Sequence, residues 1–240
     1  MRLALGLILC GALCGQSLPL GGIPVGGAPP SGPAYVNSGG DWSGGGSYTT
    51  GWSPTNGNTL IVWTIANDTT TTHTCSDGEG TGNAYTPDGV VTNGSNVVGR
   101  LFHAANVSGT GAYTITCTGT TPAVAVIEIS GNRSLDTTSA GTNPSTCADS
   151  GTANSTCYPS AFTPSTAATI LINGVGSPSA PAVTLTQHDS SYTTASSCQD
   201  GGSCFIGAIG YRAVSSAASY SDGWDFSVIL NNVGINAAYK

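Results

Sequence analysis

One short stretch of the chain carries side chains that could bind a metal ion. It reads Asp77-Gly-Glu-Gly-Thr-Gly-Asn83 and places two carboxylates and an amide in a glycine-rich turn. Calcium takes hard oxygen ligands from bendable loops, so Asp77, Glu79 and Asn83 form a candidate calcium site. The D-x-[DN]-x-[DN]-G spacing of an EF-hand is absent. The alternative is an Asx-turn hairpin, because turns require the same residue types. The sequence indicates no other cofactor.

Acid catalysis of glycoside cleavage would require two neighbouring carboxyl groups. A retaining glycosidase holds them roughly 5 Å apart, and an inverting one holds them further apart. The chain has two glutamates, Glu79 and Glu128, and they do not form the E-x-D-x-x-E pattern of sandwich glucanases. Glu128 lies in an apolar run. It is either a buried acid with a raised pKa or a carboxylate paired with Arg100 or Arg212, and the sequence favours the pair.

Nucleophilic catalysis has even less support in the sequence. No G-x-S-x-G elbow occurs. His188, Asp189 and Ser190 are consecutive, and neighbouring residues of a strand point to opposite faces, so they cannot form a triad. His73 and His103 are isolated in strand-like segments. We therefore assign no catalytic residue, and the sequence favours a protein without enzymatic activity.

Three aromatic residues near the N-terminus could stack on a sugar ring. Trp42, Tyr48 and Trp52 lie among glycines, with polar residues close in sequence. A rigid aromatic face beside hydroxyl-binding groups is typical of glycan recognition, so these residues are candidates for binding a polysaccharide or a cell-surface glycan. The alternative is that they cover one end of the core, as large aromatic side chains in loops often do.

The cysteines indicate a disulfide framework. Six of them follow the N-terminal leader, and an even number in a secreted chain implies pairing in one of 15 ways. The short spacings predict Cys147–Cys157 and Cys198–Cys204 as local bridges, which leaves Cys75–Cys117 as a bridge between strands. Without a C-x-x-C pair or clustered histidines, a zinc site is not expected.

Composition limits the class of partner. Charged residues make up 7% of the 240 residues, with 5 Lys plus Arg against 12 Asp plus Glu and a net charge of −7. Nucleic acids and anionic membranes select for clustered cations, so neither is an expected partner.

The chain divides into three parts. Residues 1–16 contain Arg2 and an apolar run followed by small and polar residues, which is typical of a secretory signal peptide and too short to span a membrane. Residues 17–56 are rich in Gly, Pro and Ser and predict an N-terminal arm or linker. Residues 57–240 predict one β domain. The protein is therefore expected outside the cell.

The remaining pattern is that of strands. Apolar residues alternate with threonines at 113–117, and apolar runs recur near 58–66, 101–105, 123–129, 168–175, 182–187, 204–212 and 224–230, separated by turn residues. The segment 236–239 could extend the last of them, residues 34–36 could pair at a sheet edge, and residues 73–75 follow the first run as a further strand. This spacing predicts an all-β protein, a two-sheet antiparallel β-sandwich of roughly ten strands.

Several segments resemble a β-sandwich module of secreted bacterial proteins, of the concanavalin-A-like or jelly-roll type. They are GNTLIV at 57–62, the turn from Asp77 to Gly82-Asn-Ala-Tyr85, VIEISG at 126–131, SLDTTSAG from Ser134, AATILINGVG from Ala167 and Trp-x-Phe-x-Val at 224–228. The resemblance covers residues 57–239 and implies a sandwich and secretion. It supplies no catalytic residues, and the six cysteines depart from the pattern.

Three classes of function are compatible with these observations. The first is a non-catalytic module that binds a glycan or a surface and acts in adhesion. The second is a structural subunit of an extracellular assembly that uses its N-terminal arm, since a donated strand can pair with an open sheet edge. The third is a jelly-roll glycoside hydrolase or lyase. The absence of a catalytic set favours the first.

Overall fold

The computed structural model describes residues 32–240, apart from 68–71, 80–81, 94–96, 138–142, 151–155, 178–181, 201, 203 and 229–230. The expected signal peptide, residues 1–16, and the first part of the expected arm, residues 17–31, lie outside the described residues. The described part of the chain is all-β, with sixteen strands in antiparallel sheets, and this confirms the predicted fold class.

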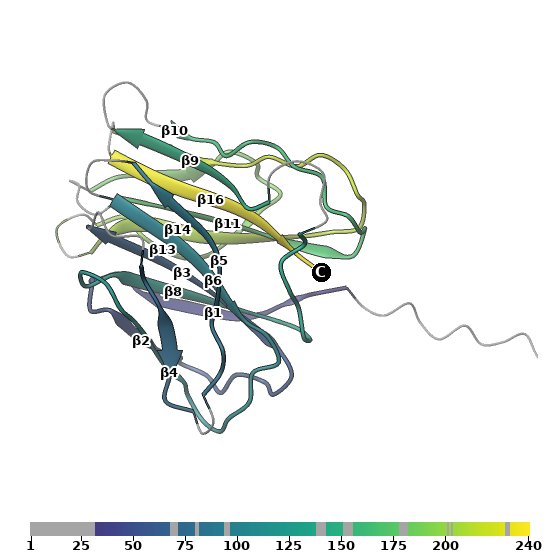
Figure 1. Cartoon of the computed structure of the whole chain (residues 1–240). Coiled ribbons are helices and arrows are strands. Elements are labelled where there is room, and N and C mark those ends of the chain that lie inside the picture. The colour runs from purple at the N-terminus through teal and green to yellow at the C-terminus, as the bar shows by residue number, and fades with distance from the viewer. Residues whose placement is uncertain are drawn as a thin grey trace, which may run out of the picture. The chain divides into compact units, whose positions relative to one another are not determined.

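Two five-stranded sheets form a sandwich (Figure 1). The first has the order β1-β8-β3-β6-β5, with β1 Tyr35–Asp41, β8 Ala123–Ile129, β3 Thr59–Asn67, β6 Val97–Ala104 and β5 Thr86–Thr92. The second has the order β13-β14-β11-β16-β9, with β13 Thr193–Cys198, β14 Ile206–Val214, β11 Thr169–Ser177, β16 Asn231–Tyr239 and β9 Ser145–Ser150. We call them the first and the second large sheet.

Each large sheet is covered on its outer face by a three-stranded sheet. The first cover has the order β2-β7-β4, with β2 Ser47–Thr49, β7 Thr114–Cys117 and β4 Cys75–Asp77. The second has the order β10-β15-β12, with β10 Thr156–Cys157, β15 Trp224–Phe226 and β12 Leu185–Gln187. Figure 1 shows β2 and β4 on one side of the sandwich and β10 on the other.

The two halves of the chain have the same topology. Adding eight to the number of each strand in the first large sheet gives the order of the second, and the same operation converts the first cover into the second. Each half therefore has eight strands, arranged as a large sheet and its cover. This internal repeat, which the sequence does not reveal, makes each half a structural reference for the other.

The core lies between the two large sheets and is shared by both halves. Ile61, Trp63 and Ile65 of β3 pack with Ile172 of β11 and Ile235 of β16, and all five are fully buried. Separate apolar clusters join each large sheet to its cover. Strands β3, β8 and β11 are buried along almost their whole length, because one face of each strand packs in the central core and the other face is covered as well.

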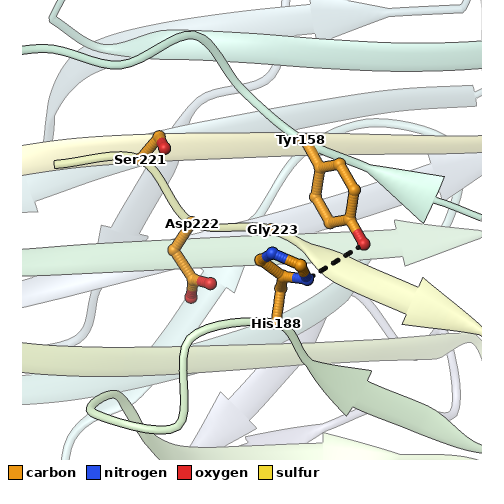
Figure 2. Close-up of a pocket in the computed structure, with 5 residues that line it drawn as sticks. All are labelled: Tyr158, His188, Ser221, Asp222 and Gly223. Atoms are coloured by element: carbon orange, nitrogen blue, oxygen red, sulfur yellow. Dashed lines mark hydrogen bonds between the residues drawn. The ribbon is translucent and has the colours of Figure 1, made fainter.

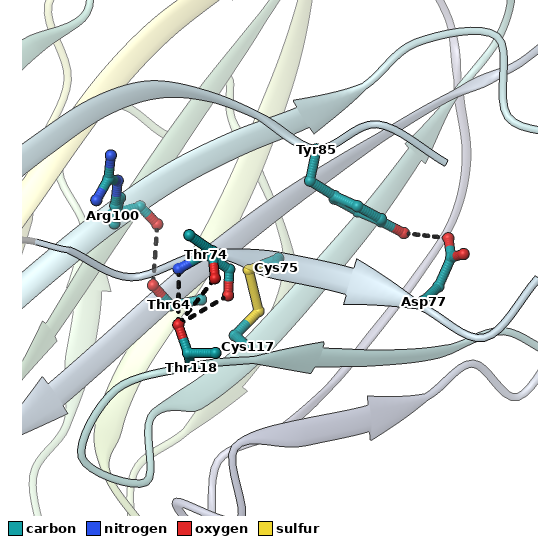
Figure 3. Close-up of a disulfide and its surroundings, with 8 residues drawn as sticks. All are labelled: Thr64, Thr74, Cys75, Asp77, Tyr85, Arg100, Cys117 and Thr118. Atoms are coloured by element: carbon teal, nitrogen blue, oxygen red, sulfur yellow. Dashed lines mark hydrogen bonds between the residues drawn. A yellow bond between two sulfur atoms is a disulfide. The ribbon is translucent and has the colours of Figure 1, made fainter. Parts of the chain in front are cut away.

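All three predicted disulfides are present: Cys75–Cys117, Cys147–Cys157 and Cys198–Cys204. The first joins directly opposed residues of β4 and β7 within the first cover (Figure 3). The second joins β9 to β10 and so fixes the second cover to the second large sheet.

The described residues form sixteen strands in four sheets, whereas the sequence predicts roughly ten strands in two sheets. The strands that were missed are β2, β5, β9, β10 and β13, which are short or dominated by Ser, Thr, Asp and Gly, so that apolar alternation is absent. The last predicted strand, 224–230, is also shorter: β15 ends at Phe226 and a separate strand, β16, begins at Asn231. The described end of the expected arm forms β1 and β2.

Candidate functional site

A surface pocket lies beside the cover of the second half. Its volume is about 140 Å³, and it is lined by Tyr158, His188, Ser221, Asp222 and Gly223 (Figure 2). These residues come from three segments that are far apart in sequence and lie next to β10, β12 and β15. Antiparallel pairing of β15 with both neighbours brings the three segments together.

The rim of the pocket is an aromatic pair beside a carboxylate. Tyr158 is 44% exposed, and its ring centroid lies 4.8 Å from that of His188, with 51° between the planes. The Tyr158 hydroxyl donates a hydrogen bond to Asp225 Oδ1 and lies 3.3 Å from His188 Nδ1. Burial, followed by the hydrogen bond to Asp225, raises the pKa of Tyr158 to about 12, so the phenol is neutral and a donor at physiological pH.

The absence of a side chain at Gly223 lets the Tyr158 ring lie close to the backbone of this segment. A Cβ at this position would collide with the Tyr158 ring and with the carbonyl oxygen of Cys157. The glycine therefore sets the position of the aromatic rim.

The floor of the pocket contains a buried carboxylate. Asp222 is 2% exposed, and its oxygens accept hydrogen bonds from Gln187 Nε2 at 2.9 Å and from the Asp189 backbone N–H at 2.7 Å. Burial raises the pKa of Asp222. Asp189 differs: hydrogen bonds from Ser191 and the charge of Arg212 lower its pKa, and Arg212 Nη1 donates to its carboxylate at 2.6 Å.

Two buried asparagines lie in the otherwise apolar layer beneath the second cover. Asn173 of β11 lies opposite Asn236 of β16 and Gly210 of β14, and Trp224 Nε1 donates to Asn173 Oδ1. Both asparagines are at most 1% exposed. The matching layer of the first half is an apolar cluster that includes Val62. Because burying amide groups costs free energy, the second half carries polarity that the fold itself does not require.

The outer faces of the two covers differ in the same way. In the first half, Thr116 lies opposite Ser47 and Ser76, and in the second half Asp225 lies opposite Thr156 and Thr186. Thr116 therefore occupies the position that Asp225 occupies in the second half. By the same register, Thr49 occupies the position of Tyr158. The aromatic and acidic groups thus belong to the second half, and the first cover presents hydroxyls in their place.

The aromatic residues singled out from the sequence are separated by the fold. Trp42 is 6% exposed, packs in the central core and donates from Nε1 to Ser196 Oγ at 3.0 Å. This burial suits the covering role that the sequence offered as the alternative. Tyr48 and Trp52 are both half-buried, with ring centroids 6.4 Å apart. Tyr48 belongs to β2 of the first cover and Trp52 lies in the loop that follows it, and both stay candidate binding residues.

Glu128 is a buried anchor for the loop that follows β2. Its carboxylate accepts hydrogen bonds from Trp52 Nε1 at 2.6 Å, Asn58 Nδ2 at 2.7 Å and the Thr55 backbone N–H at 2.8 Å. The structure corrects the expected pairing with Arg100 or Arg212. The hydrogen-bond donors come from the loop above the strand, whereas the residue opposite Glu128 on β3 is Leu60.

The candidate calcium residues lie at the end of β4 and in the loop before β5, and they accept hydrogen bonds from this loop and from the segment between β6 and β7. Asp77 accepts a hydrogen bond from Asn83 Nδ2 at 2.8 Å. It accepts another from Tyr85 Oη, also at 2.8 Å (Figure 3). Glu79 Oε2 accepts from the Thr110 backbone N–H at 3.2 Å. These contacts suit the Asx-turn alternative, and within the described segments no cluster of three His, Cys, Asp or Glu side chains is arranged to hold a metal. Calcium binding stays a prediction.

The pocket was not predicted from the sequence, although His188 and the strand that contains Asp225 were both considered. Trp224-Asp-Phe226 was recognised as a strand, and strand alternation turns Asp225 outward when both aromatic residues face inward. His188 was examined as part of a triad with its sequence neighbours, whereas its partners are Tyr158 and Asp225. Only the pairing of β10, β15 and β12 brings them together.

In the part of the chain that the structure describes, no helix is long and apolar enough to cross a membrane. Searches against protein families, curated proteins and solved structures find no match to this chain.

Proposed function

We propose that this chain is a secreted, non-catalytic module that binds a glycan through the pocket of its second half. The observation that carries the proposal is the exposed Tyr158 ring beside the Asp225 carboxylate on the rim of the pocket. An aromatic face can pack on the apolar face of a pyranose ring, and neighbouring oxygen acceptors can meet its hydroxyls.

Other features support the same proposal. Thr156 and Thr186 flank Asp225 in register and add hydroxyl groups on either side of it. Three disulfides suit an oxidising, extracellular environment. Within this proposal the sandwich is of the concanavalin-A-like or jelly-roll type, and adhesion is the role of the module. Tyr48 and Trp52 form a second candidate contact on the other half.

Replacing Tyr158 with alanine tests the proposal. We expect Tyr158→Ala to abolish retention on a glycan array, because the stacking face is removed. Its free energy of unfolding should stay within about 1 kcal/mol of the wild type, since the ring is partly exposed. Thr49→Ala, at the matching position of the first half, is the control and should bind like the wild type. Retention that survives Tyr158→Ala would remove the pocket from the proposal.

The same array separates the alternative functions. Detectable turnover of a bound polysaccharide, lost in Asp225→Asn, would favour the jelly-roll hydrolase. Failure to bind any glycan, together with self-assembly that requires residues 17–56, would favour a structural subunit.

A further inference from the structure

We infer that the ligand of this pocket carries a protonated amine and is an amino sugar polymer, such as a chain of glucosamine units. This inference rests on the proposed function and adds the class of glycan. It is carried by the charges around the pocket and by the position of the Tyr158 ring among them.

The first argument is an exposed carboxylate that lacks a strong cationic partner. The Asp225 side chain is 40% exposed, and its Oδ2 lies 3.9 Å from His188 Nδ1. Among the described residues no lysine or arginine forms an ion pair with Asp225. The neighbouring Asp189 is different, since Arg212 already neutralises it. A carboxylate accepts about four hydrogen bonds, so Asp225 can receive further donors beside the Tyr158 hydroxyl.

The second argument is the geometry of the aromatic rim. The Tyr158 side chain is 44% exposed and its hydroxyl contacts the Asp225 carboxylate, so an ammonium group bound to Asp225 from solvent would lie close to this ring. Attraction between a cation and an aromatic ring adds to the ion pair at such a position. A carboxylate beside an aromatic face suits an amine better than it suits a neutral hydroxyl.

The third argument is the sign of the surrounding field. Asp222 lies in the floor of the pocket, Asp225 lies at its rim, and the whole chain has a net charge of −7. A negative field raises the local concentration of a cationic polymer and repels one that contains uronic acids. At the matching position the first half has the neutral Thr116, so the Asp225 carboxylate has no counterpart there.

Calorimetric titration with four hexasaccharides tests the inference. The probes are the hexamers of glucosamine, of N-acetylglucosamine, of glucose (cellohexaose) and of galacturonic acid. The glucosamine hexamer is called the deacetylated one. We expect the deacetylated hexamer to bind about tenfold more tightly than the N-acetylated one, from an exposed ion pair and a cation–aromatic contact together. Added salt should reduce this preference, and the oligogalacturonate should bind most weakly.

Two variants assign the effect to the pocket. Asp225→Asn keeps the shape of the side chain and should remove the preference for the deacetylated hexamer. Asp41→Asn removes the same charge in the first half, where the carboxylate caps a turn by accepting from the Ser43 N–H, and should preserve the preference.

The outcomes separate this inference from the proposed function. If the N-acetylated and deacetylated hexamers bind equally, and Tyr158→Ala abolishes both, glycan binding stands and the amino sugar is wrong. If Asp225→Asn preserves the preference, the inference is also overturned. If Tyr158→Ala binds all hexamers like the wild type, the proposed function itself fails.

Discussion

At the scale of single residues, three carboxylates differ in their burial and in the number of hydrogen-bond donors around them. Glu128 and Asp222 are both buried and are surrounded by donors from their own chain. Asp225 is exposed and contacts the rim residues Tyr158 and His188. Burial alone is therefore a poor guide to function here. The buried carboxylates organise loops, whereas the exposed one is free to meet a ligand.

Replacing Glu128 with glutamine should destabilise the protein. Two side-chain donors and one backbone donor point at its carboxylate, and an amide nitrogen in place of one oxygen would face a donor. We expect Glu128→Gln to lower the free energy of unfolding by about 1–3 kcal/mol in urea titrations. Glu79→Gln is the control, because the Glu79 side chain accepts one bond from a backbone N–H and should lose less. Equal stability of both variants would contradict the anchoring role.

At the scale of elements, sequence patterns predicted the strands that carry apolar residues. Strands β3, β8 and β11 have continuous apolar runs and were located correctly. The polar edge strands β9 and β13 were not, because their Ser, Thr and Asp residues are equally typical of loops. The pocket depends on β10, which has two residues, and strands of that length carry no periodic signal. The disulfides could be predicted, since the two short spacings left one remaining pair.

The fit between the two large sheets depends on glycines beneath Trp63. A Cβ at Gly99 of β6 would lie 2.8 Å from Trp63 Cζ2 and 3.0 Å from Val233 Cγ2, so the buried indole has no room to move away. We expect Gly99→Ala to cost about 1–3 kcal/mol through overpacking, measured by chemical denaturation. Gly51→Ala is the control: nothing lies within 4 Å of its Cβ position, so the change should be about 0.5 kcal/mol or less. A Gly99→Ala variant of wild-type stability would mean that the sheets can separate without penalty.

At the scale of the whole molecule, the repeat of eight strands allows one fold to combine a shared core with two different outer surfaces. The two halves share topology, and their inner faces pack against each other in one core. The outer layers then diverge without disturbing that core. Both halves have an apolar cluster under the cover, and the second half also has Asn173 and Asn236 in that layer and Asp222 and the aromatic rim beside it.

The shared core predicts that both halves unfold together. Separating them would expose the inner faces of both large sheets, including Trp63 and Ile235, which are fully buried. Exposing apolar surface costs about 25 cal/mol for each Å². Unfolding of either half alone would expose the inner face of the other half, so this cost opposes separate unfolding. We expect one calorimetric transition whose measured and van't Hoff enthalpies agree, although 240 residues exceeds the length at which two-state unfolding is usual. Gly99→Ala, which perturbs the contact between β6 and Val233 of the second half, should lower the temperature of the whole transition. Its division into two peaks would show that the halves fold as independent domains.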